Sequence, residues 1–352
     1  MNDYYPGTNW EHDDRGWDRA ALAIVLESAR ELNSTDIAVV HRGRLVADAR
    51  WQPGPVAAAE VVESLPDGRV RQDIASAQKS VSSVLAAIAV GRGLLDINSP
   101  VSAHLGKGWA GPKAPPSEER ITVRHLLTMT SGLADDMSFV AEPGTRWDYN
   151  LGPAYHTVKR VLEAAAGSSI DELTASWLTG PLGMTASGWV RRTWREGTPE
   201  LLRPSFQYPD GEPIEGFVTT AQDLARFGLA VLRGCMWNGT ALGADPNYAA
   251  AMVRPSQPFN PAYGYLWWLN GQDRYLAPKN ETVFEGSFFP NAPGDTFGAL
   301  GAMDRMCVVI PSLDLVITRS GGLAQERSAA GSAFVRSLVA SVCAAHPLRR
   351  LP

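Results

Sequence analysis

The sequence predicts an α+β fold, an α/β sandwich in which an antiparallel sheet is flanked by helices and carries an inserted all-α lobe. Helix and strand patterns stand near both ends of the 352-residue chain, and the region between them has mainly helical patterns. This arrangement is typical of a sheet with flanking helices joined to a helical lobe. We expect residues 17–105 and 205–345 to form the sandwich lobe, and residues 106–204 to form the mainly helical lobe.

The N-terminal part begins with a predicted helix over residues 17–32, WDRAALAIVLESAREL, whose apolar residues recur at helical spacing. Residues 37–51, IAVVHRGRLVADARW, predict two strands joined at Arg42-Gly43 as a hairpin. A nearly charge-free, apolar segment over residues 74–95 predicts a buried helix.

The middle of the chain opens with a Gly/Pro-rich connection over residues 106–120. From 121 to about 186 the patterns are mostly helical, and Thr122 stands in the position of an N-cap. The helical stretches are ITVRHLLTMTSGL, YHTVKRVLEAAAG and SIDELTASWL.

The C-terminal part begins with a predicted helix over residues 219–234, with Thr219 or Thr220 as its N-cap and Gly234 at its end. Further elements follow: two β-branched strands over 306–320 joined at Pro311-Ser312, and a final helix over 326–345. We find no internal repeat and no low-complexity tract.

Composition narrows the possible partners. The net charge is -5 and no run of Lys or Arg stands out, so nucleic acid and anionic membranes are not expected partners. No apolar run reaches the length of a membrane span, and the polar, acidic N-terminus lacks the features of a signal peptide.

The three cysteines are far apart and odd in number, which favours reduced thiols and a cytoplasmic location. The histidines lack metal-ligand spacing, so we expect no metal and no cofactor. Oligomeric state has no signal in the sequence.

Ser76 and Lys79 are candidates for chemistry, because residues three apart on a helix lie on one face. Burial and the positive field of the helix N-terminus both lower the pKa of a lysine there. A neutral lysine amine beside a hydroxyl can act as a general base and make the serine a nucleophile. The alternative is coincidence, because five lysines and an ordinary serine content produce this spacing in about one such sequence in three.

Several stretches together resemble the serine β-lactamase and penicillin-recognising superfamily, from about residue 37 to 340. They are SAQKSVSSVLAAIAVGRGLLDINSPV, ITVRHLLTMTSGL, EPGTRWDYN, PLGMTASGW, GFVTTAQDLARFG and YGYLWW. The resemblance implies the sandwich fold described above, with an active site between the two lobes. It implies Ser76 as the acyl-accepting nucleophile, Lys79 as its general base, and Tyr149 as the tyrosine of the second motif.

The second motif departs from the usual Tyr-x-Asn of the family. Leu151 stands where the asparagine would be, and Asn150 directly follows Tyr149. A phenol at this position can share a proton with the lysine and pass it to the leaving group. The alternative is that Tyr149 is an ordinary loop aromatic.

The third motif, normally Lys-Thr-Gly or His-x-Gly, is absent from the C-terminal third. The segment with Phe297-x-Ala299-x-Gly301 is instead similar to the branch of 6-aminohexanoate-dimer hydrolases and related esterases, although Asp304-Arg305 replaces the Gly-Gln common there. A backbone N–H near Ala299 to Gly301 would complete an oxyanion hole with that of Ser76, unless the glycines merely bend a strand. The loss of the motif's cation disfavours recognition of carboxylates, as in β-lactams and C-terminal peptides.

The residues therefore predict a serine hydrolase that acts on a small-molecule carboxylic ester or linear amide. Candidates for the substrate pocket are Trp147, Asn150, Leu151 and Arg305. One alternative is a D-amino-acid peptidase or weak β-lactamase of the same fold, and another is a non-catalytic binding protein that retains it. A conventional α/β-hydrolase would need Gly-x-Ser-x-Gly, which the sequence lacks.

Overall fold

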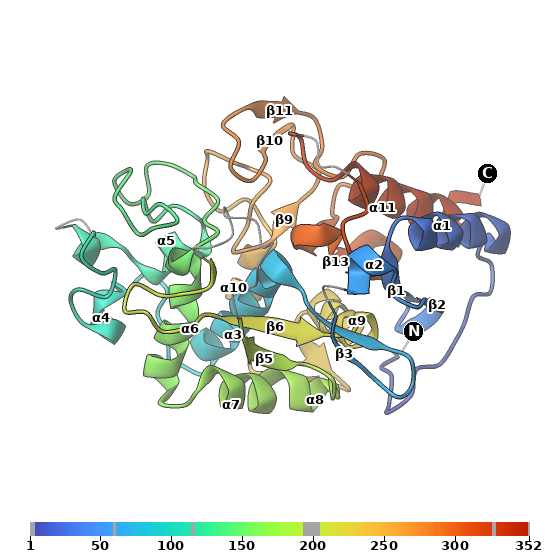
Figure 1. Ribbon diagram of the computed structural model, residues 1–352, viewed down its shortest axis with the longest axis horizontal. Coiled ribbons are helices and arrows are strands. Elements are labelled where there is room, and N and C mark those ends of the chain that lie inside the picture. Colours follow the sequence, from blue (N-terminus) through green and yellow to red (C-terminus); the bar gives the residue numbers. More distant parts are fainter. Residues whose placement is uncertain (1–3, 59–60, 114–116, 193–204, 326–328, 351–352) are drawn as a thin grey trace.

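A six-stranded antiparallel sheet in the order β2-β1-β14-β13-β12-β9 forms the larger layer of the protein (Figure 1). The structure is a computed structural model that describes residues 4–58, 61–113, 117–192, 205–325 and 329–350. The strands are β1 (Ser34–His41), β2 (Arg44–Arg50), β9 (Trp268–Leu269), β12 (Phe297–Leu300), β13 (Met306–Ile310) and β14 (Leu315–Gly321). Nearly every residue of β1, β13 and β14 is buried, so both faces of the sheet are covered.

Both predicted hairpins are confirmed. Strands β1 and β2 pair antiparallel around Arg42 and Gly43, whose φ angles of 52° and 76° fit the tight hairpin turn that needs two left-handed residues. Strands β13 and β14 pair antiparallel across a short 3₁₀ turn, η6 (Pro311–Leu313), followed by Asp314. The local turn residues therefore specify the central strand pairs.

Helices cover the two faces of this sheet (Figure 1). Helix α9 (Ala221–Leu232) lies against β1, β13 and β14, while α1 (Arg19–Glu31) packs beside α11 (Ala333–Ala345). Thr220 is the N-cap of α9, because its hydroxyl accepts a hydrogen bond from the backbone N–H of Asp223. A Cβ at Gly228 would lie 2.6 Å from Cγ1 of Val316, so glycine lets this helix approach the sheet closely.

A second, four-stranded sheet in the order β3-β4-β6-β5 is absent from the sequence-based prediction. Its strands are β3 (Val61–Ser64), β4 (Val70–Asp73), β5 (Gly188–Arg191) and β6 (Glu215–Thr219). These strands are short, and β6 pairs with segments far away in the chain, so no local pattern indicates them. Strand β5 also lies inside the range 106–204 that we expected to be mainly helical. The proposed division into two lobes stays a prediction.

The buried helix α3 (Gln78–Gly91) lies between this small sheet and a group of further helices, and it contacts α6 and α10. The other helices are α2 (Pro55–Ala58), α4 (Ser102–Leu105), α5 (Val123–Leu127), α6 (Pro153–Ala166), α7 (Ile170–Thr174), α8 (Gly180–Leu182) and α10 (Pro246–Met252). A π-helical segment, η3 (Ala175–Thr179), joins α7 to α8, and short 3₁₀ turns stand at η1 (Ala75–Ala77), η2 (Glu118–Arg120), η5 (Ala302–Asp304) and η7 (Pro347–Arg350). Two small hairpins are β7 (Met236–Trp237) with β8 (Thr240–Ala241), and β10 (Arg274–Leu276) with β11 (Val283–Glu285). None of the described helices combines the length and apolar character needed to cross a lipid bilayer.

Candidate active site

Ser76 lies in a sharp turn between strand β4 and helix α3. The turn is fixed at Asp73, whose carboxylate accepts a 2.7 Å hydrogen bond from the backbone N–H of Ala75. Ala75 has a φ of 50°, a left-handed conformation that a residue with a Cβ adopts only under constraint from its surroundings. This strained turn leaves Ser76 partly exposed, while the rest of α3 continues into the core.

Lys79 stands one helical turn after Ser76 and points back toward it. Its Nζ donates a 2.9 Å hydrogen bond to Oγ of Ser76. The lysine is 1% exposed, and its Nζ lies 4.6 Å from the ring centroid of Tyr149 and 3.7 Å from that of Tyr155. The structure therefore brings together the three residues that the resemblance assigned to catalysis.

The surroundings of Lys79 favour its neutral form. Burial is the main cause that holds the pKa of Lys79 well below its usual range, and the positive charges of Arg192 and Lys279 act in the same direction. Asp135 opposes them. An amine that is neutral and within hydrogen-bond distance of a hydroxyl can accept its proton.

Tyr149 is held by aromatic neighbours from its own loop, from the loop before β9 and from β9 itself. Its ring stacks on Trp268 at 5.6 Å, and Tyr263 and Trp147 contact it with centroids at 6.0 and 6.1 Å. Trp268 in turn stacks on Phe288. Aromatic packing of this kind fixes the phenol ring beside Lys79 with little rotational freedom.

The end of β12 lies against the turn that carries Ser76, and its backbone N–H groups alternate in direction. The N–H of Gly301 donates to the carbonyl of Arg305 at 2.8 Å, on the side of β13. Since N–H directions alternate along a strand, the N–H of Ala299, which is paired with Cys307, also faces β13. The N–H groups of Ala299 and Gly301 themselves are therefore directed at β13, and within the predicted stretch only that of Leu300 is directed away from it. Which N–H completes an oxyanion hole stays a prediction. Ala302, the first residue of η5, has its N–H on the opposite side and no acceptor for it within its own helix.

Gly301 has a different role, because it allows the two backbones to touch. A Cβ at this position would lie 2.2 Å from the carbonyl oxygen of Ile74 and 3.3 Å from Cβ of Ala75. We expect Gly301→Ala to push the turn away from β12 and to lower kcat/KM for a p-nitrophenyl ester by about 10²-fold, the usual effect of a displacement near 1 Å. Gly298→Ala on the same strand, whose Cβ would meet only side-chain atoms at 3.2 Å and beyond, is the control. Equal activity of both variants would contradict this assignment.

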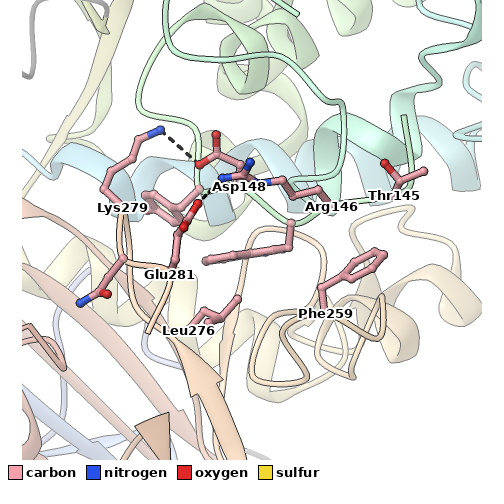
Figure 2. A pocket seen from close by; sticks show the side chains of 10 residues that line it. Thr145, Arg146, Asp148, Phe259, Leu276, Lys279 and Glu281 are labelled. Carbon is pink, nitrogen blue, oxygen red and sulfur yellow. Dashed lines mark hydrogen bonds and ion pairs between the residues drawn. The ribbon is translucent and has the colours of Figure 1, made fainter. Parts of the chain in front are cut away.

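A cavity of about 470 Å³ lies beside Tyr149 (Figure 2). Its apolar wall comes from Trp147, Phe259 and Leu276, and charged residues surround its rim. The rim joins loops from distant parts of the chain. Arg146 pairs with Glu281 at 2.6 Å, and Lys279 lies 3.3 Å from Asp148 and 3.1 Å from Asp135. The cations at this cavity therefore stand beside carboxylates.

Of the four residues expected to contact substrate, only Trp147 lines this cavity. Asn150 is buried, and its Nδ2 donates to the carbonyl of Leu133. The backbone N–H of Leu151 donates to the carboxylate of Asp135 at 2.7 Å. The expectation that Arg305 contacts substrate is wrong. Its side chain is buried and donates to the backbone carbonyls of Asp73 and Gly321, so it links β4 to β14.

Sequence reasoning missed Arg192, which follows β5 and reaches the back of the site. Its guanidinium forms a bidentate ion pair with Asp73, at 2.7 and 2.9 Å. No local pattern indicates this pair, because β6 stands between the two residues in the sheet. Tyr155 was also missed, because it reaches Lys79 from a helix that is distant in the chain. Among the residues that the structure describes, no group of three or more His, Cys, Asp or Glu is arranged to hold a metal ion.

Comparison with known proteins finds solved structures with the same fold. A putative beta-lactamase from Bacteroides dorei is similar over 93% of this chain and 98% of its own, with a TM-score of 0.67 and 18% identity. A putative 6-aminohexanoate-dimer hydrolase from Bacillus anthracis covers 99% of this chain and 90% of its own, with a TM-score of 0.65 and 17% identity. The hydrolase EstCE1, described as having promiscuous acyltransferase activity, covers 93% and 99%, with a TM-score of 0.62 and 16% identity. The pattern of the beta-lactamase family matches residues 21–320, so the resemblance is confirmed and the chain belongs to that family.

Proposed function

We propose that the protein is a serine hydrolase that forms an acyl-enzyme at Ser76 on carboxylic esters or linear amides. The observation that carries this proposal is the 2.9 Å contact between Ser76 and a fully buried lysine. A buried amine of lowered pKa is placed where a general base must stand to activate the hydroxyl. A protein that only binds ligands has no need for this arrangement.

The reaction follows from these positions. Oγ of Ser76 attacks the carbonyl carbon while its proton passes to Nζ of Lys79. The backbone N–H groups of Ser76 and Ala302 stabilise the negative oxygen that forms. When the C–O or C–N bond breaks, the leaving group takes a proton through the hydroxyl of Tyr149, which the amine of Lys79 supplies. Water then attacks the acyl carbon with the same residues as base, and the acid is released.

The charges around the site support neutral substrates. Thr296 to Gly301 contains no cation, and the nearby Arg305 is engaged with backbone carbonyls. Recognition of a substrate carboxylate, as in β-lactams or C-terminal peptides, requires a cation that is available. The apolar wall formed by Trp147, Phe259 and Leu276 suits an alkyl or aromatic part of the substrate. We also propose the cytoplasm as its location, on the odd number and wide spacing of the cysteines.

The acyl-enzyme can be trapped directly. Rapid mixing with p-nitrophenyl butyrate should release a burst of about one p-nitrophenol per protein before steady turnover. Mass spectrometry of acid-quenched samples should locate the butyryl group on the peptide that contains Ser76. Addition of linear amides and β-lactams to parallel samples ranks the substrate classes. A butyryl group on another residue, or none at all with every substrate, would refute the proposal.

A further inference from the structure

The turn before Ser76 is held by a largely buried ion pair. The guanidinium of Arg192 donates from Nε and Nη2 to the two carboxylate oxygens of Asp73, and the two side chains are 12% and 25% exposed. The carboxylate oxygen that accepts from Nη2 also accepts from the N–H of Ala75. The strained residue before the nucleophile is thus attached to Arg192 through one carboxylate.

The same guanidinium also supports the surroundings of Lys79. The guanidinium of Arg192 stands next to the hydroxyl of Tyr155, to which Gln78 donates at 3.3 Å. The ring of Tyr155 is the closer of the two rings that face Nζ of Lys79, at 3.7 Å. One side chain therefore contacts the support of Ser76 and the support of Lys79.

The neighbouring strand leaves room for this ion pair. A Cβ on Gly216 of β6 would lie 2.0 Å from a carboxylate oxygen of Asp73 and 2.6 Å from Nε of Arg192. Glycine at this position has an ordinary backbone conformation, so space is the property that it supplies. Any larger residue at position 216 would displace the pair.

We propose that Arg192 is a positioning residue that aligns Ser76 with Lys79 through its contacts with Asp73 and Tyr155. The inference rests on the proposed function, since it concerns the same serine and lysine. Arg192 itself does not touch the reacting atoms. It fixes the turn on one side and the aromatic face on the other, and it places a permanent positive charge behind the amine.

The positive charge of Arg192 has a testable effect on the pKa of Lys79. The groups that face Lys79 are Arg192 after β5, Asp135 and Lys279 on loops, Tyr149 before α6, and Tyr155 and His156 on α6. Arg192 disfavours the protonated amine. Removal of Arg192 should raise the pKa of Lys79, because a nearby positive charge is lost. The carboxylate of Asp73, left without its cation, adds to this increase. The acid limb of the pH profile, below which Lys79 is protonated and inactive, then moves to higher pH.

The experiment compares Arg192→Met and Arg192→Lys with the wild type in the pH dependence of kcat/KM for p-nitrophenyl butyrate. We expect Arg192→Met to move the acid limb upward by about one pH unit. Arg192→Lys keeps the charge but not the bidentate geometry, so its limb should stay in place while kcat falls about tenfold. Arg233→Met is the matched control. Arg233 is also 12% exposed, and it pairs at 2.8 Å with Asp314 in the turn between β13 and β14.

The outcomes that would overturn the role of Arg192 are as follows. Folded Arg192 variants with the wild-type profile would overturn the inference, and so would an equal shift in Arg233→Met. If Arg192→Met does not fold, Asp73→Asn replaces it, because its amide oxygen still accepts from Ala75 while the ionic contact is lost. A wild-type kcat in that variant, or failure of all three variants to fold, would reduce Arg192 to a structural residue. Absence of acylation at Ser76 in the wild type would instead refute the proposed function itself.

Discussion

Ser76→Ala is expected to lower kcat/KM for p-nitrophenyl butyrate by at least about 10³-fold while the fold is retained. The hydroxyl is the only part removed, and it lies on a partly exposed turn where a methyl group fits. Without it the acyl-enzyme cannot form, and the base at Lys79 has no proton to accept. Initial rates and circular dichroism of both proteins, measured side by side, check the prediction.

Ser80→Ala is the matched control, because Ser80 lies one turn further along the same helix. Its hydroxyl is buried and donates to the carbonyl of Leu266 at 2.7 Å, away from the reacting atoms. This variant should lose some stability but keep activity within a few-fold of the wild type. Equal activity in the wild type and Ser76→Ala would leave Ser-Ala-Gln-Lys as a helix start with a coincidental lysine. The non-catalytic binding protein would then be the better interpretation.

Lys79→Met is expected to lower kcat/KM by about 10²–10⁴-fold, the usual contribution of a general base. The same change should raise the melting temperature, because methionine fills the space without a group that must be desolvated. The folded-state pKa of Lys79 lies below its unfolded value, so the folded protein binds fewer protons than the unfolded chain. The resulting penalty is fully present below the folded pKa and fades as pH rises toward the unfolded value.

Thermal unfolding at mildly acidic and mildly alkaline pH checks this second part. The gain in melting temperature of Lys79→Met over the wild type should be larger at the acidic pH and shrink at the alkaline one. Lys113→Met is a control, because Lys113 is an exposed lysine paired with Asp136 on the surface. A folded Lys79→Met protein with full activity would end the proposed mechanism. A gain that does not change with pH would show that Lys79 is not held at a lowered pKa.

The sequence by itself determined those features whose physical cause is local. Ser76 and Lys79 stand one helical turn apart, so helix geometry alone brings Oγ and Nζ to hydrogen-bond distance. The two central hairpins follow from turn residues with their required backbone conformations. The N-caps at Thr122 and Thr220 follow from side chains that reach the third backbone N–H of their own helix.

Only the tertiary structure decided what depends on strand pairing and on the direction of side chains. The four-stranded sheet brings Arg192 to Asp73, and no periodicity in either segment indicates that contact. Arg305 turns inward to the carbonyls of Asp73 and Gly321, although its place after the third motif suggested a substrate contact. The alternation of N–H groups along β12 directs those of Ala299 and Gly301 at β13 and leaves those of Leu300 and Ala302 on the other side. These features depend on contacts between distant segments, whose register and burial are fixed only when the whole chain packs.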